Sequence, residues 1–477
     1  MAEEITLAAK SIFLCLDIET DDVAGTGNVD LSGATGSITL TTDVTVDTDA
    51  AGGGTGGIAS FGSKVRSNAS ADHDFVVTTG DGVITLSDGA GSNGGDDLGS
   101  VSLTSTGGIN LSGTIYTDDN NGHTGDVTIT GNATLNSSVV LIATQGGDAT
   151  FTGTITDAAN TYTLRFATDA AGGNVDLQDD VTIGRLDIYN ANIVDLDDVT
   201  TNGVGAAGGI DIGSLAAVTR IDINGTLYDT GSGDPSESGA IDFNSDNIDI
   251  FANATFDTST GNGAGVGGAV TFGNGGSAID ADVNDGANDR SINIVTTGAG
   301  GDGAVDIDGN IGGNVSFDGG VTIDGGSVTT NSIDTRGGAA GESGGAVNID
   351  GSGAVWMGGI TVTTGNGVGN GGNVNVDSSG STVTVANISA SGGGGGGDTG
   401  GTIGIQTTAG GEIRLGGSSI SNGAGTAGNN ITIGNTGNDP AVILSTDVTI
   451  STGAGSAGNI VFGDGDIDAS DCCRRRR

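Results

Sequence analysis

Carboxylates are the most abundant chemically active groups in this 477-residue chain, which has 59 Asp and Glu residues against 13 Lys and Arg. Adjacent acid pairs matter because cleavage of a glycosidic bond uses two convergent carboxyl groups. Neighbouring residues of a β-strand point to opposite faces, so pairs that lie in strands cannot converge on one substrate. The pairs are Asp21-Asp22, Asp96-Asp97, Asp118-Asp119, Asp179-Asp180 and Asp197-Asp198.

Other catalytic groups are scarce. The two histidines, His73 and His123, both stand in polar segments that we expect to be loops, and the internal arginines are dispersed. A polysaccharide hydrolase or lyase needs a general acid or base, or a basic residue beside calcium-bound carboxylates. We therefore predict no catalytic residues and no enzymatic activity. A carbohydrate-active enzyme is the less favoured alternative, which a cluster of inward-facing Asp and Arg in one surface groove would support.

Calcium fits this composition better, because Asp and Asn in turns can supply oxygen ligands. Two segments match the Gly-Gly-x-Gly-x-Asp nonapeptide loosely: in Gly300–Val305 the acid, Asp306, comes one place late, and Gly434–Asp439 runs into a proline. A third segment, Asp464–Asp471, resembles the second half of an EF-hand or dockerin loop, but the preceding ligand positions are apolar. We predict that calcium is a credible partner without a specific site, and that there is no other cofactor or cofactor-binding residue.

Composition favours strands joined by tight turns. Gly accounts for 96 residues, Pro for only 2, and aromatic residues for 3%. The apolar residues are mainly Val, Ile and Ala, which are typical of short strands with small-radius turns between them. The net charge of −46 repels phosphate and anionic lipid, so we predict neither a nucleic-acid partner nor membrane insertion.

An internal repeat organises the chain. Two small residues, often Gly-Gly, precede Asn, Ala or Asp and then an alternating apolar pair. Towards the C-terminus the first apolar residue of this phrase recurs every 27 to 29 residues, which is the signature of a solenoid. These clear marks are Val347, Val374, Ile403, Ile431 and Ile460. Earlier marks are less even, and one long gap is expected to hide a turn; they are Val29, Ile58, Val101, Val127, Ala149, Val175, Ile210, Ile241, Val270 and Val305.

Each repeat contains three short apolar segments with the period of two that strands require. Val374/Val376, Val383/Val385 and Ile388 form one such set. We predict an all-β, right-handed parallel β-helix of about 28 residues per three-strand coil, in which each strand lies beside its equivalent in the next coil. It would run as a single domain over residues 1–470, with irregular, loop-inserted coils in 1–346, regular coils in 347–470 and a non-native tail in 471–477.

The phrases Gly371-Gly372-Asn373-Val374-Asn375-Val376 and Gly428-Asn429-Asn430-Ile431-Thr432-Ile433 carry a resemblance to a known family. In style they resemble the repeat regions of filamentous haemagglutinin-like exoproteins, which are large bacterial adhesins with right-handed β-helical passengers. The resemblance implies an extracellular or bacterial cell-surface location and an adhesive role with a host, cell-surface or matrix receptor. It implies no functional residue of this chain.

We therefore expect an extracellular structural or adhesive scaffold, either a stalk or a fibre-forming protein. Exposed strand edges at both ends would allow copies to associate end to end. A calcium-dependent matrix protein is the first alternative. Because no targeting signal is visible near Met1, we expect the chain to be a fragment of a longer exported protein.

Overall fold

The computed structural model is all-β. Its described residues form 47 strands and no helix. Parallel strands stack as a β-solenoid of about 14 turns, about 27 residues apart, as the sequence predicted. None of the described segments forms a helix with the length and apolar character needed to cross a bilayer. The described residues are 4–20, 27–49, 56–68, 71–93, 95–118, 125–157, 159–168, 172–203, 208–231, 238–260, 265–273, 278–282, 289–338, 341–363, 369–393, 398–408, 410–423, 427–435, 440–453, 458–463 and 465–469.

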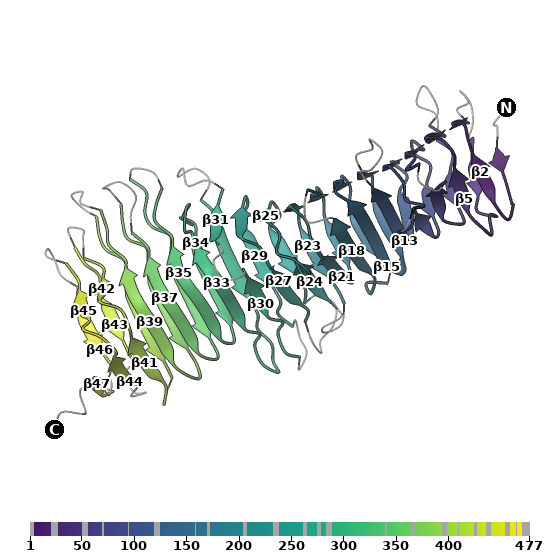
Figure 1. Ribbon diagram of the computed structural model, residues 1–477. Helices are drawn as coiled ribbons and strands as arrows, with labels where there is room; N and C mark the ends of the chain where they lie inside the picture. The colour runs from purple at the N-terminus through teal and green to yellow at the C-terminus, as the bar shows by residue number, and fades with distance from the viewer. Residues whose placement is uncertain are drawn as a thin grey trace. The chain divides into compact units, whose positions relative to one another are not determined.

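The chain divides into two compact units, Met1–Ile221 and Asp222–Arg477, called unit 1 and unit 2 below. In each unit the strands of successive turns lie side by side as rungs (Figure 1). Strand β25 (Arg220–Ile223) spans the boundary between the units.

Unit 1 has three sides, each a column of parallel strands. The first column contains β1 (Ile5–Thr6), β4 (Val29–Leu31), β7 (Ala59–Phe61), β10 (Ile84–Leu86), β13 (Ile109–Asp118), β15 (Ala133–Gln145), β17 (Ile155–Asp157), β20 (Val181–Ile183) and β23 (Val199–Thr201). The second contains β2 (Ile12–Leu14), β5 (Ile38–Leu40), β8 (Val65–Ser67), β11 (Gly89–Ala90), the later parts of β13 and β15, β18 (Thr163–Thr168), β21 (Arg185–Ile188) and β24 (Gly209–Ile212). The third contains β3 (Ile18–Glu19), β6 (Val44–Asp47), β9 (Phe75–Thr78), β12 (Val101–Thr104), β14 (Val127–Thr130), β16 (Ala149–Phe151), β19 (Val175–Leu177) and β22 (Ile193–Leu196).

Unit 2 is built in the same way. Its first column contains β26 (Leu227–Asp229), β29 (Ala254–Asp257), β32 (Ser291–Val295), β34 (Gly320–Gly325), β36 (Val347–Gly351), β38 (Val374–Ser378), β40 (Ile403–Thr407), β43 (Ile431–Ile433) and β46 (Ile460–Phe462). The second contains β27 (Ala240–Phe243), β30 (Val270–Phe272), β33 (Val305–Ile311), β35 (Val328–Asp334), β37 (Val355–Thr361), β39 (Val383–Ser389), β41 (Glu412–Leu415), β44 (Ala441–Leu444) and β47 (Ile467–Ala469). The third contains β28 (Asn247–Ile250), β31 (Ala278–Ala281), the later parts of β33, β35, β37 and β39, β42 (Ser419–Ser421) and β45 (Thr449–Ser451).

Several turns merge two sides into one strand, which the sequence did not predict. The segments Val383/Val385 and Ile388 both belong to β39, whose first part pairs with β41 and whose last part pairs with β42. The pairing of β33 with β35 shifts in register between Ile307 and Asn310, where the strand passes from one side to the next. The corner is therefore absorbed as an irregularity within a continuous strand.

The regular marks of the sequence lie in register. Val347 pairs with Val374, then Ile403, Ile431 and Ile460 in turn, all in the first column of unit 2. Among the earlier marks, Val101, Val127, Ala149 and Val175 also pair in succession. The long gap before Val101 does hide a turn, in which Phe75 holds the equivalent position.

The other earlier marks lie in different columns. Ile241, Val270 and Val305 pair in succession in the second column of unit 2, and Val29 lies in the first column of unit 1. The residue paired with Val29 is the buried Ala59, whereas its neighbour Ile58 is exposed. Ile210 pairs with Leu186, on a different side of unit 1 from Val175. The spacing of the early marks is therefore uneven partly because the marked residues lie in different strand columns.

The core consists of the inward-facing members of each strand. In β29, for example, Ala254 and Phe256 are buried and alternate with more exposed residues. Aromatic rings stack within unit 2, where Phe256 lies over Tyr228 with ring centroids 5.1 Å apart and Phe243 over Phe272 at 5.2 Å. Both pairs are in-register neighbours on successive turns, so the parallel ladder itself places ring upon ring.

Buried threonines close the loops between strands. The hydroxyl of Thr258, at the end of β29, donates a hydrogen bond of 2.6 Å to the carbonyl oxygen of Gly268, just before β30. Such a bond satisfies a backbone carbonyl that the loop would otherwise leave buried and unpaired. The same hydroxyl-to-glycine bond is made by Thr20, Thr48, Thr144, Thr168, Thr230, Thr296 and Thr335.

Asp and Asn side chains join one turn to the next. Asp126 accepts a hydrogen bond from the backbone N–H of Asp148, and Asp148 accepts one from that of Asn174, which is the equivalent residue a turn later. In unit 2, Asn373 and Asn430 accept from the N–H groups of Thr402 and Asn459 in the same manner. The Asn or Asp of the repeated phrase is therefore a structural bond between turns.

Candidate metal centre

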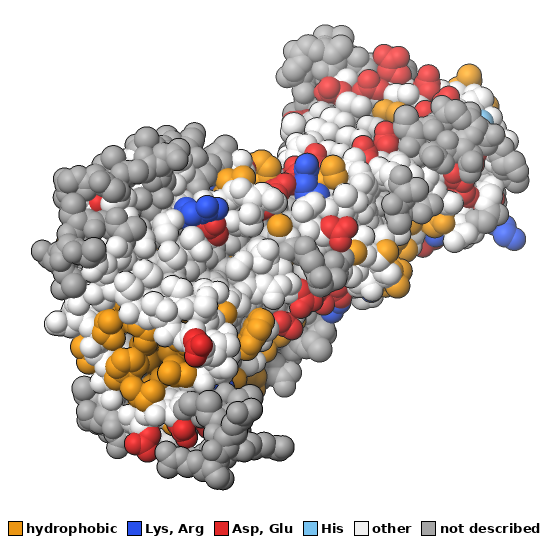
Figure 2. All heavy atoms as spheres, turned by 60° about the vertical axis from the view of Figure 1, so that its left-hand side comes forward, with side chains coloured by type: hydrophobic (Ala, Val, Ile, Leu, Met, Phe, Trp, Pro, Cys, Tyr) orange, Lys and Arg blue, Asp and Glu red, His pale blue; other side chains and the backbone are white. Residues whose placement is uncertain are grey.

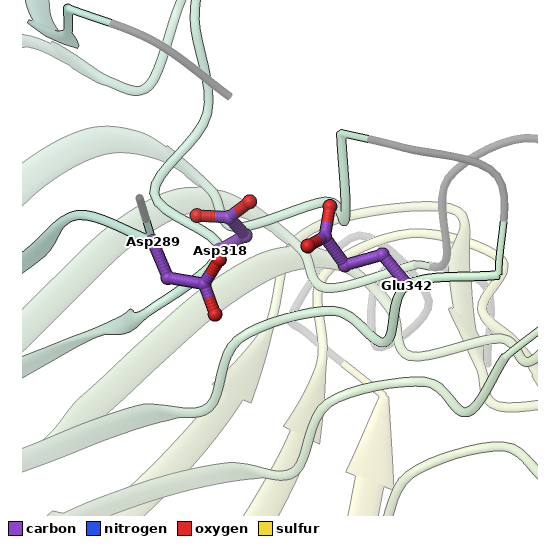
Figure 3. Close-up of side chains that lie close together, drawn as sticks. All are labelled: Asp289, Asp318 and Glu342. Carbon is purple, nitrogen blue, oxygen red and sulfur yellow. The ribbon is translucent and has the colours of Figure 1, made fainter. Parts of the chain in front are cut away.

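Three carboxylates from three successive turns of unit 2 meet at one corner. Asp289 precedes β32, Asp318 precedes β34 and Glu342 precedes β36, and these three strands pair in this order. One carboxylate oxygen from each residue lies within 4.8 Å of those of the other two. Figure 3 shows the three carboxyl groups gathered together on loops from the different turns. We call these residues the acidic triad.

The middle residue of the acidic triad is buried. Asp318 is only 7% exposed, and neither of its carboxylate oxygens accepts a hydrogen bond from another residue's N–H or hydroxyl group among the described residues. The carboxyl group of Glu342 is close enough to share a proton with it. The backbone holds this loop in place, because the N–H of Phe317 donates to the carbonyl oxygen of Asp334 and that of Gly319 to the carbonyl oxygen of Arg290. A buried carboxylate without such a donor is costly, so the position calls for a compensating group.

The electrostatics of the acidic triad disfavour a full set of negative charges. Burial raises the pKa of Asp318 to about 6, and the nearby charges of Asp289 and Glu342 act in the same direction. Glu342 also accepts a hydrogen bond of 2.7 Å from the backbone N–H of Gly338, which fixes the loop on its side. The side chain of Arg290, which follows Asp289 in the chain, forms an ion pair with Asp282 at 2.7 Å.

Chemically, the acidic triad is an all-oxygen donor set with a negative charge to neutralise. Oxygen ligands of this type bind hard divalent cations such as Ca²⁺ and Mg²⁺. A carboxyl group with a raised pKa is also a candidate for proton transfer, since burial tunes such groups toward neutral pH. The geometry therefore allows either a cation site or a shared proton among the carboxylates.

The sequence analysis did not single out any member of the acidic triad. Asp289 and Asp318 each stand two residues before the start of a strand, but Glu342 stands further from its own strand, so no common spacing links the three. The signal that could have found them is the register of β32, β34 and β36, which aligns the loops in front of these strands.

Two of the acid pairs lie in turns, so the rule that strand neighbours point to opposite faces, by which the sequence analysis set the pairs aside, does not apply to them. Asp179-Asp180 separates β19 from β20, and Asp197-Asp198 separates β22 from β23 one turn later. The first carboxylate of each pair accepts a hydrogen bond from the N–H of the second residue. Burial and the three neighbouring acids raise the pKa of Asp180. The two pairs are thus brought together, although by turn geometry rather than by strands.

The remaining acid pairs have structural partners where they are described. Asp96 forms an ion pair of 2.9 Å with Arg66, and the buried Asp97 accepts a hydrogen bond from the N–H of Gly95. Asp118 is buried at the end of β13. Asp21, Asp22 and Asp119 lie outside the described residues.

The structure describes part of the segments that match calcium motifs loosely. Their described acidic residues lie in a turn or a strand. Asp302 accepts a hydrogen bond from the N–H of Gly298, and Asp306 lies in β33. In the dockerin-like segment, Ile467–Ala469 forms strand β47, as the strand interpretation predicted. Residues 436–439, 464 and 470–477, which include the proposed tail, lie outside the described residues.

Several arginines and the described histidine lie beside acidic residues near them in the fold. His73 lies 3.5 Å from Asp43, whereas His123 is outside the described residues. Arg165 contacts Asp187 at 2.9 Å and stacks on Tyr189, with 4.6 Å from the guanidinium carbon to the ring centroid. Further arginine–acid pairs are Arg185–Asp211, Arg336–Asp334 and Arg414–Glu412.

Comparison of the chain with protein-family models, curated proteins and solved structures finds no match.

Proposed function

We propose that this chain is an extracellular structural or adhesive scaffold, used as a stalk or in a fibre at a bacterial surface. The observation that carries the proposal is the way polar side chains are used. Asp148, Asn373 and their equivalents bond the backbone of the next turn, and buried threonines bond the loops. Such residues maintain a repeating architecture, which supports a mechanical role.

The surface is consistent with this role. Figure 2 shows acidic side chains scattered over the face in view, with few basic ones between them. A strongly acidic surface favours solubility and repels other acidic polymers. The likeness of the repeated phrases to those of filamentous haemagglutinin-like adhesins supports the same proposal, including a cell-surface or matrix receptor.

The proposal includes association of copies end to end. Ile460 and Ile467 lie in the last described turn. The residues that pair with them one turn earlier, Ile431 and Val442, are buried, whereas Ile460 and Ile467 are 42% and 53% exposed. Among the described residues no strand pairs with the outer edge of β46 or β47, nor with that of β1 or β2 at the other end. Because parallel strands stack head to tail, we propose that the first turn of a second copy can pair with these edges.

A polysaccharide turnover assay separates the scaffold from the carbohydrate-active alternative. The full chain is incubated with acidic and neutral polysaccharides, with and without Ca²⁺, and the release of reducing ends and of unsaturated products is followed. A scaffold gives the rate of a protein-free control in every case. Turnover that is lost in an Asp318→Asn variant would instead identify the acidic triad as a catalytic site.

A further inference from the structure

We propose that Asp289, Asp318 and Glu342 bind a calcium ion that joins three successive turns of unit 2. The inference goes beyond the scaffold function, because a scaffold needs no metal and the site can exist whichever function the chain has.

The first argument is the unmet bonding capacity of Asp318. Other loop Asp residues accept hydrogen bonds. Asp126 and Asp148 accept from backbone N–H groups of the next turn of the solenoid, and Asp302 accepts from the N–H of Gly298. Both oxygens of Asp318 are buried and accept no hydrogen bond from another residue's N–H or hydroxyl group among the described residues. The nearest polar groups are the other two carboxylates of the triad, and Glu342 is close enough to share a proton with Asp318. A cation satisfies the oxygens and the charges together.

The second argument is the spacing of the donors. The oxygens of the acidic triad all lie within 4.8 Å of one another. Opposite ligands of a calcium ion are about 4.8 Å apart, because each Ca–O distance is about 2.4 Å, so one ion can reach all three. Magnesium demands a near-ideal octahedron and usually keeps several waters, so three side chains on irregular loops suit it less well. Since the donors contain neither nitrogen nor sulfur, zinc and copper are disfavoured.

The third argument is topological. The triad residues belong to the loops in front of β32, β34 and β36, which are neighbours in one column. An ion held by all three would restrain these loops against one another across three turns. Binding would therefore stabilise the folded state by mass action.

The test is a calcium titration of the full chain by isothermal calorimetry, after chelation and dialysis, in buffer of physiological ionic strength. The wild type should show one saturable high-affinity event above any diffuse binding to the acidic surface. Asp318→Asn should weaken this event about tenfold or more, because a ligand charge is lost. An excess of Mg²⁺ should not abolish it.

The matched control is Asp350→Asn. Asp350 lies in the same unit, and its pKa is also raised, first by burial and then by the nearby Asp377 and Asp302. The variant removes the same charge from an acidic neighbourhood outside the triad, so it should bind calcium as the wild type does. Equal loss in both variants, or no saturable binding in the wild type, would overturn the proposal.

Melting curves keep the test independent of folding defects. Without calcium, Asp318→Asn should melt no lower than the wild type, since it removes a buried charge. With calcium, only the wild type and Asp350→Asn should gain melting temperature. If Asp318→Asn does not fold, the exposed Asp289→Asn serves in its place. Retained binding in a folded Asp289→Asn or Asp318→Asn variant counts against the site.

Discussion

Asp148 accepts a hydrogen bond of 2.8 Å from the backbone N–H of Asn174, the residue that holds the equivalent position one turn later. Asn174 in turn accepts from the N–H of Ile193 at 3.2 Å. A side chain that bonds its own successor in the repeat links sequence periodicity directly to the stacking of turns. This relationship explains why Asn or Asp recurs in front of the strands.

Replacement of Asp148 by Ala should destabilise unit 1, because the N–H of Asn174 loses its partner. The site is solvent-accessible, so the expected loss is about 1 kcal/mol in the free energy of unfolding. Asp148→Asn retains the accepting oxygen and should remain near the wild type. Denaturant unfolding measures both, and a greater loss in Asp148→Asn than in Asp148→Ala would contradict the assignment.

Loss of the hydrogen bond from the hydroxyl of Thr258 to the carbonyl of Gly268 should destabilise unit 2 more than the Asp148 change destabilises unit 1. Thr258→Val keeps the shape of the side chain but leaves the carbonyl of Gly268 without its buried donor, at a cost of about 1–3 kcal/mol. Thr258→Ser restores a hydroxyl and should recover most of the loss. Thr255→Val, on the partly exposed face of the same strand, is the control and should change little. Equal losses at both positions would show that the hydroxyl of Thr258 has no special role.

The raised pKa of Asp318 predicts a pH dependence in the metal-free protein. The folded state holds this proton up to about pH 6, whereas an unfolded Asp releases it near 3.8, so the folded state binds more protons between these values. Stability should therefore fall as the pH rises from about 4 to about 6 and level off above, by roughly 3 kcal/mol in all. Unfolding of the wild type and Asp318→Asn across this range isolates the contribution, and parallel curves would argue against it.

The exposed end of unit 2 predicts self-association. Ile460→Lys places a charge at the inward position of the last described strand of its column, so it should reduce the formation of dimers and longer species. Association of the wild type should strengthen with salt, because the copies are acidic. Thr432→Lys, on the outward face one turn earlier, is the control. Light scattering after size exclusion measures both, and a wild type that stays monomeric at high concentration and salt would contradict end-to-end stacking.

The sequence predicts the fold well because the solenoid repeats its own signal. Val347, Val374 and Ile403 are buried and alternate with polar residues, and their spacing directly gives the register that the structure shows. Merged strands such as β39 were missed because the alternation of apolar residues breaks between Val385 and Ile388, which reads as the end of a strand, although the backbone there continues without a residue of positive φ. Ile58 was mistaken for a core residue because it stands next to Ala59, and alternation alone does not reveal which of two apolar neighbours faces inward.

The acidic triad could not be predicted in the same way. Its members lie in loops whose lengths differ from turn to turn, so their meeting depends on how the loops fold over the ends of the strands. Among 59 acidic residues, composition alone does not separate Asp318 from the structural Asp148. The distinction is the hydrogen bonding: Asp148 accepts from the next turn, whereas both oxygens of Asp318 are buried without such a donor.

The most direct test of the scaffold proposal is an adherence measurement. The full chain is displayed on a non-adherent bacterium through a heterologous outer-membrane anchor, and attachment to matrix-coated surfaces and autoaggregation are counted against an anchor-only strain. We predict increased attachment or autoaggregation without any turnover of polysaccharide. Attachment and autoaggregation equal to those of the anchor-only strain, together with polysaccharide cleavage by the displayed chain, would contradict the scaffold proposal.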